Sequence, residues 1–329
     1  MVRLLTLDDV IVVADPIAEV GLRLLRRSFR EVRLVGSLDE AQFTKTVSDA
    51  QAIVTRLTNI SRNVIESAGQ LRVIVRHGVG VDNIDVAAAT ERGVQVVFTP
   101  EGFTVSVAEF TVGAMLSLLR RNKAADSAAR AGNWAGRDLE LVGTELFGKT
   151  VGIVGLGRIG FEVAKRIKPF EAELLYYDLV RHSEAERKIG IDFTPFHTLL
   201  ARSDIVTLHV PATSENYHML GRKELTLMKP TASLINMARG SVVDEAALVD
   251  VLSSGRLAGA ALDVFEREPL TKENPLVQLP NVLLSPHMSG HTEEALDRTA
   301  VEVAEAVVMV LSGKRVRYIA NPEVLKHCR

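Results

Sequence analysis

The motif SPHMSG, residues 285–290, contains a single imidazole, His287, between a proline and a glycine. Histidine titrates near neutral pH and can therefore donate or accept a proton during catalysis. A lone histidine among apolar residues is, however, more often a hydrogen-bonded core residue than a catalyst. Partners elsewhere in the chain must decide between these two interpretations.

Two other charged residues follow predicted strands upstream of His287. The segment LINMARGSVVDEAAL, residues 234–248, ends a strand at Asn236 and then presents Arg239, and the later EREPL presents Glu268. Open α/β sheets bind ligands at the carboxyl ends of their strands. Arg239 by itself is equally compatible with a surface salt bridge. Taken together, three successive strand–helix crossings end in arginine, glutamate and histidine.

A glycine motif indicates a nucleotide site. GKTVGIVGLGRIGFEVAKRI, residues 148–167, places Gly155, Gly157 and Gly160 at G-x-G-x-x-G spacing between a strand and a helix. Gly155 permits a tight turn, Gly157 lets backbone amides approach a pyrophosphate, and Gly160 allows close helix–strand packing. The same spacing also occurs in an ordinary tight turn. The next strand ends at Asp178, where a Rossmann unit carries the acid that binds the adenosine ribose.

The charge of Asp178 bears on which dinucleotide binds. A carboxylate accepts hydrogen bonds from both ribose hydroxyls of NAD but repels the 2′-phosphate of NADP. Arg181 follows three residues later and could accommodate some NADP, although it also suits a solvated loop. The sequence therefore predicts NAD as the cofactor.

The elements that position these residues form two α/β series. Near-continuous Val/Ile runs predict parallel strands that are buried on both faces. A long apolar segment begins near Ser106, with Glu109 completing a capping box, and bridges the two series. A last helix is predicted at 292–312. Strands are predicted at 10–15, 32–36, 52–56, 71–78 and 94–99, and then at 150–154, 173–177, 204–208, 232–236, 258–263 and 281–284.

Composition excludes several classes of protein. The 329 residues are 47% hydrophobic and 24% charged, and 39 basic against 41 acidic residues give a net charge of −2 without charge blocks. We therefore expect small-molecule partners and neither nucleic acid nor a membrane. Cys328 is the single cysteine, so no intramolecular disulfide, thiol nucleophile or cysteine-based metal cluster is expected, and no metal site is predicted. Asp8, Asp9 and Asp15 interrupt the N-terminal apolar stretch, and no apolar run after it is expected to reach the roughly 18 to 20 residues of a membrane span. A cytoplasmic location is therefore expected.

These motifs, with RHGVGVDNID (76–85) and GAALDVFEREP, resemble the D-isomer specific 2-hydroxyacid dehydrogenase family across nearly the whole chain. Within it they are most similar to the phosphoglycerate dehydrogenases. The resemblance implies a Rossmann NAD-binding domain, residues 103–293, inserted into a flavodoxin-like substrate domain, residues 1–102 plus 294–329. The substrate cleft would lie between the domains. The chain ends without a regulatory domain, so a short form without effector control is expected.

The resemblance also implies a role for each charged residue. Arg239 would bind the substrate carboxylate and polarise the keto oxygen, His287 would exchange the proton, and Glu268 would orient and charge His287. The chemistry agrees, because hydride transfer to a carbonyl carbon leaves negative charge on oxygen that a proton must neutralise. A carboxylate beside the ring favours imidazolium, and the arginine fork binds a carboxylate through two hydrogen bonds.

Further contacts are implied by the matching positions. The N–H groups near Val79 and Gly80 would bind the substrate carboxylate, and Arg56 and Arg76 would contact the substrate, with solvated charges as the alternative. Asp263 would lie near the nicotinamide carboxamide. Other cofactor contacts would come from Arg158, Ile159, Met237, Ala238 and Gly290.

The expected activity is NAD-dependent interconversion of a D-2-hydroxy acid and a 2-keto acid, with 3-phosphoglycerate as the first candidate. Phe103 stands where many relatives have asparagine, and Val79 stands where some phosphoglycerate dehydrogenases have threonine. Both departures leave hydroxypyruvate or glyoxylate reduction open. A non-catalytic, NAD-sensing corepressor-like protein and phosphite oxidation are further alternatives. Formate dehydrogenases pair the histidine with glutamine, where this chain has Glu268.

Two expectations remain. By resemblance, a homodimer would form through the nucleotide domain, with the helix near 106–121 and the segment around Trp134 reaching the partner. His291, in SGHT, has no assigned role.

Overall fold

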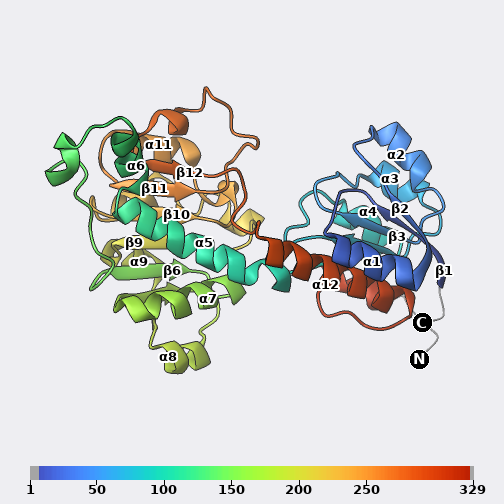
Figure 1. Cartoon of the computed structure of the whole chain (residues 1–329). Coiled ribbons are helices and arrows are strands. Elements are labelled where there is room, and N and C mark those ends of the chain that lie inside the picture. The colour runs from blue at the N-terminus through green and yellow to red at the C-terminus, as the bar shows by residue number, and fades with distance from the viewer. Residues whose placement is uncertain (1–6, 327–329) are drawn as a thin grey trace. The chain divides into compact units, whose positions relative to one another are not determined.

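The computed structural model describes residues 7–326, so Cys328 lies outside the described residues. The chain divides into two compact units (Figure 1). The first unit is Met1–Phe103 with His291–Arg329, and the second is Thr104–Gly290. The boundaries expected from sequence lie one residue before the first of these divisions and three residues after the second.

The first unit contains a five-stranded parallel sheet in the order β2-β1-β3-β4-β5. This is the flavodoxin-like order 2-1-3-4-5. Four of these strands have buried Val and Ile side chains, as the apolar runs predicted, whereas β2 is buried only at Phe29 and was wrongly predicted to be a buried strand. They are β1 (Leu7–Val13), β2 (Phe29–Leu34), β3 (Ala52–Thr55), β4 (Val73–Arg76) and β5 (Gln95–Phe98).

Helices cover both faces of this sheet. Ile11 and Val13 of β1 pack with the residues of α1 and α12, whereas Val12, between them, packs with α2, α3 and α4. The alternation follows from the two-residue period of a strand. α1 and α12 lie side by side (Figure 1). The helices are α1 (Glu19–Ser28), α2 (Glu40–Thr46), α3 (Arg62–Ser67), α4 (Val86–Glu91) and α12 (Glu293–Leu311).

The second unit contains a seven-stranded parallel sheet in the order β12-β11-β10-β9-β6-β7-β8. The strand order reverses at β6, which pairs with β7 on one side and β9 on the other. Ligands bind at such a switch point. The strands are β6 (Thr150–Val154), β7 (Glu173–Tyr177), β8 (Asp192–Phe193), β9 (Ile205–Leu208), β10 (Ser233–Asn236), β11 (Gly259–Leu262) and β12 (Val282–Leu284).

The helices of the second unit alternate with these strands. Their bounds are α6 (Asn122–Arg130), α7 (Arg158–Ile167), α8 (Ser183–Ile189), α9 (Phe196–Arg202), α10 (Arg222–Leu227) and α11 (Glu245–Ser253). The predicted fold class, two doubly wound parallel α/β domains, is therefore confirmed. The short edge strand β8 was not predicted, because two residues carry too little pattern.

The long apolar segment differs from its prediction. One helix, α5, spans Glu101–Leu119, and a left-handed residue, Arg121, separates it from α6. Ser106 is a buried residue inside α5 and not its N-cap. The helix begins earlier because α12 stabilises its first turn: the N–H of Gly102 donates to Glu302 at 3.3 Å. Sequence spacing does not report such a tertiary cap.

α5 is also long and apolar enough, by length and composition, to cross a membrane, so the prediction that no run reaches that length is wrong. The core helix of a soluble protein satisfies the same criterion. In α5, 39% of the apolar window is buried inside the protein, including Ala108, Thr111 and Met115.

Candidate active site

His287 and Glu268 are in contact in the second unit. Nδ1 of His287 lies 2.8 Å from Oε2 of Glu268, and Oε1 of Glu268 accepts the N–H of Phe265 at 3.1 Å. The two residues follow the neighbouring strands β12 and β11. When Nδ1 donates to Glu268, Nε2 is the nitrogen that can exchange a proton with a bound molecule. The His287 side chain is 50% exposed, which does not fit a core histidine.

Asp263 holds the backbone turn that carries His287. Its side chain is fully buried, and its carboxylate accepts hydrogen bonds from Oγ of Ser285 (2.6 Å) and from the N–H groups of Met288 and Ser289 (2.8 Å each). Its carbonyl accepts the N–H of His287 at 2.8 Å. These bonds stabilise His287 in the left-handed region, at φ +51°. The sequence did not predict this role for Asp263.

Arg239 follows β10, the next strand in the same sheet. Asn236 fixes the turn: its Nδ2 donates to the carbonyl of Arg239 at 2.9 Å, and its Oδ1 accepts the N–H of Ala238 at 3.0 Å. Nη1 of Arg239 donates to the carbonyl of Ala238 at 2.7 Å. Three neighbouring strands, β10, β11 and β12, thus present Arg239, Glu268 and His287 at the same edge of the sheet.

The glycine turn lies at the carboxyl end of the central strand β6. A Cβ atom at Gly155, where φ is +91°, would lie 2.7 Å from the carbonyl oxygen of His209, and one at Gly160 would collide with the carbonyl of Gly155. A Cβ atom at Gly157 would meet no protein atom within 4 Å. Gly157 is the N-cap of α7 and provides no side-chain cap. The open space beside this N-terminus fits the pyrophosphate of a dinucleotide.

Asp178 connects the end of β7 to this turn. Its Oδ2 accepts the N–H of Leu156 at 2.8 Å and lies 3.3 Å from Nε2 of His182. Arg181 does not face Asp178: it forms two hydrogen bonds, of 2.9 and 3.0 Å, with Glu186. This pairing favours the structural interpretation of Arg181.

The remaining predicted cofactor residues lie on the same sheet edge. Arg158 and Ile159 begin α7, and Met237 and Ala238 are buried directly after β10. Gly290 ends the second unit.

In the first unit, Arg76 fixes the loop that contains Val79 and Gly80. Its Nε donates to the carbonyl of Gly80 at 2.8 Å and its Nη1 to the carbonyl of His77 at 2.7 Å. Val79 is exposed at the tip of this loop. The described contacts of Arg76 therefore shape the loop, whereas the sequence had assigned this side chain to the substrate.

Arg56 follows β3 and contacts His291. Nη2 of Arg56 is in hydrogen-bonding contact with Nε2 of His291, 235 positions away in the chain. The N–H of Arg56 donates to Oδ2 of Asp15 at 2.7 Å. Partial burial tends to raise the pKa of Asp15, but hydrogen bonds from Arg56 and its neighbours outweigh this effect and lower it. Asp15 thus fixes the backbone from which Arg56 extends.

His77 was missed at the sequence level. It is buried, its ring lies edge-on to Phe103 at 5.7 Å, and neither ring nitrogen has a hydrogen-bond partner. Burial first, and then the charge of Arg56, lower the pKa of His77 to about 4, so the ring is neutral near pH 7. Its position in RHGVG, at the end of a predicted strand, was the available signal.

One cluster presents metal-ligand atoms. His218, Asp244 and Glu266 place such atoms within 4.8 Å of one another. Asp244 already caps α11 by accepting the N–H of Ala247 at 2.9 Å, and Glu266 accepts the N–H of Glu245 at 3.0 Å. These internal bonds account for the cluster without an ion.

The sheet order, the glycine turn at the switch point and the acid that ends the next strand define a Rossmann-type dinucleotide-binding protein. The chain belongs to the D-isomer specific 2-hydroxyacid dehydrogenase family. The NAD binding domain described for that family matches residues 112–289.

The relatives include two kinds of enzyme, D-3-phosphoglycerate dehydrogenase and glyoxylate reductase. The chain is 41% identical over 312 residues to D-3-phosphoglycerate dehydrogenase of Archaeoglobus fulgidus, covering 94% of this chain and 59% of that protein. It is 46% identical over 289 residues to glyoxylate reductase of Thermofilum pendens, covering 87% and 85%. Among solved structures, NADPH-dependent glyoxylate/hydroxypyruvate reductase of Sinorhizobium meliloti matches with a TM-score of 0.85 at 30% identity, covering 95% and 97%.

Proposed function

We propose that this protein is an oxidoreductase that interconverts a D-2-hydroxy acid and its 2-keto acid with NAD, and that its best substrate pair is 3-phosphoglycerate and 3-phosphohydroxypyruvate. The observation that carries the proposal is the Glu268–His287 contact of 2.8 Å at the ligand-binding edge of the nucleotide sheet. Reduction of a keto acid needs a proton donor at that edge.

In this proposal His287 is the acid in reduction and the base in oxidation. Nε2 gives its proton to the developing alkoxide oxygen, while Glu268 stabilises the protonated ring through Nδ1. Asp263 supports His287 by accepting hydrogen bonds from the backbone N–H groups of its turn. In oxidation the neutral ring takes the hydroxyl proton.

Arg239 binds the other end of the reacting group. Its planar fork suits the substrate carboxylate, and it draws electron density from the keto oxygen. The exposed loop at Val79 and Gly80 supplies backbone N–H groups for the same carboxylate. This requires the loop shape that Arg76 fixes with its bonds of 2.8 and 2.7 Å.

The residues present fit a dinucleotide. Bound NADH supplies the hydride that C2 of the keto acid receives. The turn at Gly155 and Gly157 would hold the pyrophosphate of the cofactor. The Asp178 carboxylate would accept hydrogen bonds from its ribose hydroxyls. We infer a preference for NAD over NADP of at least about tenfold in kcat/KM, or about 1.4 kcal/mol, because the Asp178 carboxylate repels a 2′-phosphate. Equal efficiency with NADPH would remove Asp178 from this role.

The choice of a phosphorylated substrate rests on positive charge in the first unit. Arg56 lies against His291, and the charges of Arg56 and then Arg76 lower the pKa of the buried His77 after burial itself. Such a cluster favours a substrate with a second anionic group. The glyoxylate reductases among the relatives favour the second candidate, hydroxypyruvate or glyoxylate.

The test is a panel of 3-phosphohydroxypyruvate, hydroxypyruvate and glyoxylate, each with NADH and with NADPH. We expect the highest kcat/KM for 3-phosphohydroxypyruvate with NADH. A higher value for glyoxylate would select the second candidate. No turnover of any keto acid would contradict the enzyme and support a binding protein of the corepressor kind.

We also propose a homodimer that forms through the second unit. Trp134, Leu139 and Val142 are exposed apolar residues in the segment that follows α6, and such patches mark protein interfaces. Sedimentation velocity across a hundredfold concentration range tests the proposal. A monomer at every concentration would refute it.

A further inference from the structure

The turn after Arg239 and the segment that leads to Glu268 are in direct backbone contact. Gly240 is buried, and a Cβ atom there would collide with the carbonyl of Phe265 and the N–H of Glu266. Because only glycine leaves room for this approach, the place of Arg239 depends on the place of the segment 265–268.

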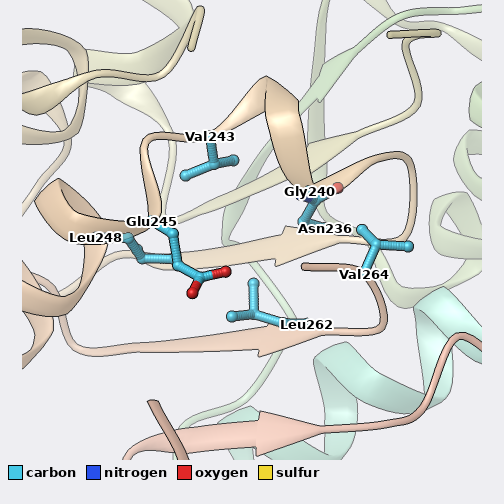
Figure 2. Close-up of a pocket in the computed structure, with 7 residues that line it drawn as sticks. All are labelled: Asn236, Gly240, Val243, Glu245, Leu248, Leu262 and Val264. Atoms are coloured by element: carbon cyan, nitrogen blue, oxygen red, sulfur yellow. The ribbon is translucent and has the colours of Figure 1, made fainter. Parts of the chain in front are cut away.

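Two glutamates join the same segments. The N–H of Glu245 donates to Oε1 of Glu266 at 3.0 Å, and the N–H of Glu266 donates to Oε2 of Glu245 at 3.2 Å. Nδ2 of Asn274 donates to Oε1 of Glu245 at 2.7 Å. Figure 2 shows the Glu245 carboxylate directed toward a cavity of about 10 Å³ that Gly240 also lines. Two negative charges on adjacent segments repel each other unless a donor or a cation compensates.

His218 lies beside this pair and contacts both segments. Its Nε2 lies 2.6 Å from Oε1 of Glu266, and its backbone N–H donates to the carbonyl of Ser241 at 2.8 Å. Ser241 belongs to the turn that follows Arg239. The ring of Tyr217 stacks on the imidazole, with centroids 3.9 Å apart and planes 17° apart, and fixes its orientation.

We propose that His218 is a positioning residue that sets the spacing between Arg239 and the Glu268–His287 pair. The backbone of His218 holds the arginine turn. Its ring holds Glu266, which precedes Glu268 by two residues. The inference rests on the proposed function, because it assigns His218 to the same reaction.

The test compares His218→Ala with His218→Gln and with the control His197→Ala. His197 lies on α9 of the same unit, with Nε2 3.7 Å from Oε1 of Glu224, so the control removes a similar pair away from the sheet edge. kcat and KM for keto-acid reduction are measured across pH, together with the NADH Kd and the Tm. NMR follows the titration of the His287 ring.

His218→Ala is expected to lower kcat/KM about tenfold and to move the pH profile and the His287 titration to lower pH. Glu268→Gln, which removes the carboxylate from the ring, should move both in the same direction. NADH binding should not change, because the glycine turn is untouched. His218→Gln should recover most of the activity, since an amide keeps a polar side chain beside Glu266.

An unchanged pH profile and an unchanged His287 titration in folded His218→Ala would overturn the proposal, as would equal effects of His197→Ala. If His218→Ala does not fold, Glu266→Gln provides the same test, because it keeps an acceptor for the Glu245 N–H and loses the charge that faces His218. The NMR titration needs no turnover. An inactive wild-type protein would therefore refute the proposed function while the titration still decides the role of His218.

Discussion

The two units have the same parallel α/β architecture, but the basic side chains at their proposed sites have different neighbours. In the second unit, the basic side chain of His287 lies against a carboxylate, Glu268, and a buried aspartate, Asp263, holds the turn beneath it. In the first unit, Arg56 lies against another basic residue, His291, and Arg76 donates to backbone carbonyls. One site places a basic side chain against a carboxylate, and the other places basic side chains beside one another.

The difference follows from what each site is proposed to do. Proton exchange needs a partner that stabilises imidazolium in place, so the histidine and its carboxylate are preorganised. Binding an anion needs positive charge at the place where the anion binds. Two parallel α/β sheets can thus have different proposed roles in one reaction. The neighbours of the basic side chains distinguish these roles, whereas the fold class does not.

The largest expected effect is the loss of proton exchange in the second unit, and it should apply to every substrate. His287→Ala should lower kcat/KM on the order of 100- to 10,000-fold in both directions, because the variant loses the group proposed to exchange the proton. The NADH Kd and the Tm should stay close to those of the wild type. Preserved activity per folded molecule with a lower Tm would instead make His287 a packing residue.

Arg239→Lys should have the next largest effect. Lysine keeps the charge but loses the two-bond fork, and hydrogen bonds to charged groups contribute about 1.5–3 kcal/mol, so turnover should fall roughly 10- to 100-fold. Steady-state kinetics with 3-phosphohydroxypyruvate and glyoxylate should show similar losses. Near-normal turnover of either would mean that the carboxylate binds elsewhere.

Arg56→Gln sharpens the comparison, because its effect should depend on the substrate. Loss of one charge-assisted hydrogen bond should lower kcat/KM for 3-phosphohydroxypyruvate about tenfold and leave that for glyoxylate almost unchanged. Arg62→Gln is the control, since Arg62 is an exposed arginine of the same unit that pairs with Glu91. Equal losses for both substrates would argue against selective anion binding by the first unit.

The smallest effect concerns stability in acid. Burial, followed by the charge of Arg56, lowers the pKa of His77 from 6.5 to about 4. The unfolded chain therefore binds this proton first as the pH falls, and the free energy of unfolding decreases between pH 6.5 and 4. The contribution of His77 between pH 7 and 5 is about 2 kcal/mol.

His77→Phe should remove this contribution. Urea unfolding at pH 7 and 5 should show a smaller acid loss in the variant than in the wild type, with His197→Phe as the exposed control. An equal acid loss in His77→Phe and the wild type would show that His77 is not buried and neutral.

The positions of most strands, and the sheet edge that carries the proposed site, could be predicted from the local sequence pattern. Uninterrupted Val/Ile runs fixed the location of β1, β3, β4 and β6 to within a few residues, because a strand covered on both faces must be apolar at every position. The glycine spacing located the turn at β6 for a similar reason, since Gly155 and Gly160 face protein atoms that exclude a side chain. The start of α5 was not predictable, because Glu302, 200 positions away, caps it.

The sequence by itself determined the two α/β series, the glycine turn and the order of Arg239, Glu268 and His287 after three strands, because each depends on residues close together in the chain. Only the tertiary structure decided the partners: Glu268 on the His287 ring, Asp263 under its turn, and His291 against Arg56. These contacts join segments 19 to 235 residues apart. Parallel pairing of β11 with β12, through backbone hydrogen bonds that are common to all residue types, brings Glu268 and Asp263 to the turn of His287, whereas His291 reaches Arg56 because the chain returns to the first unit just before α12.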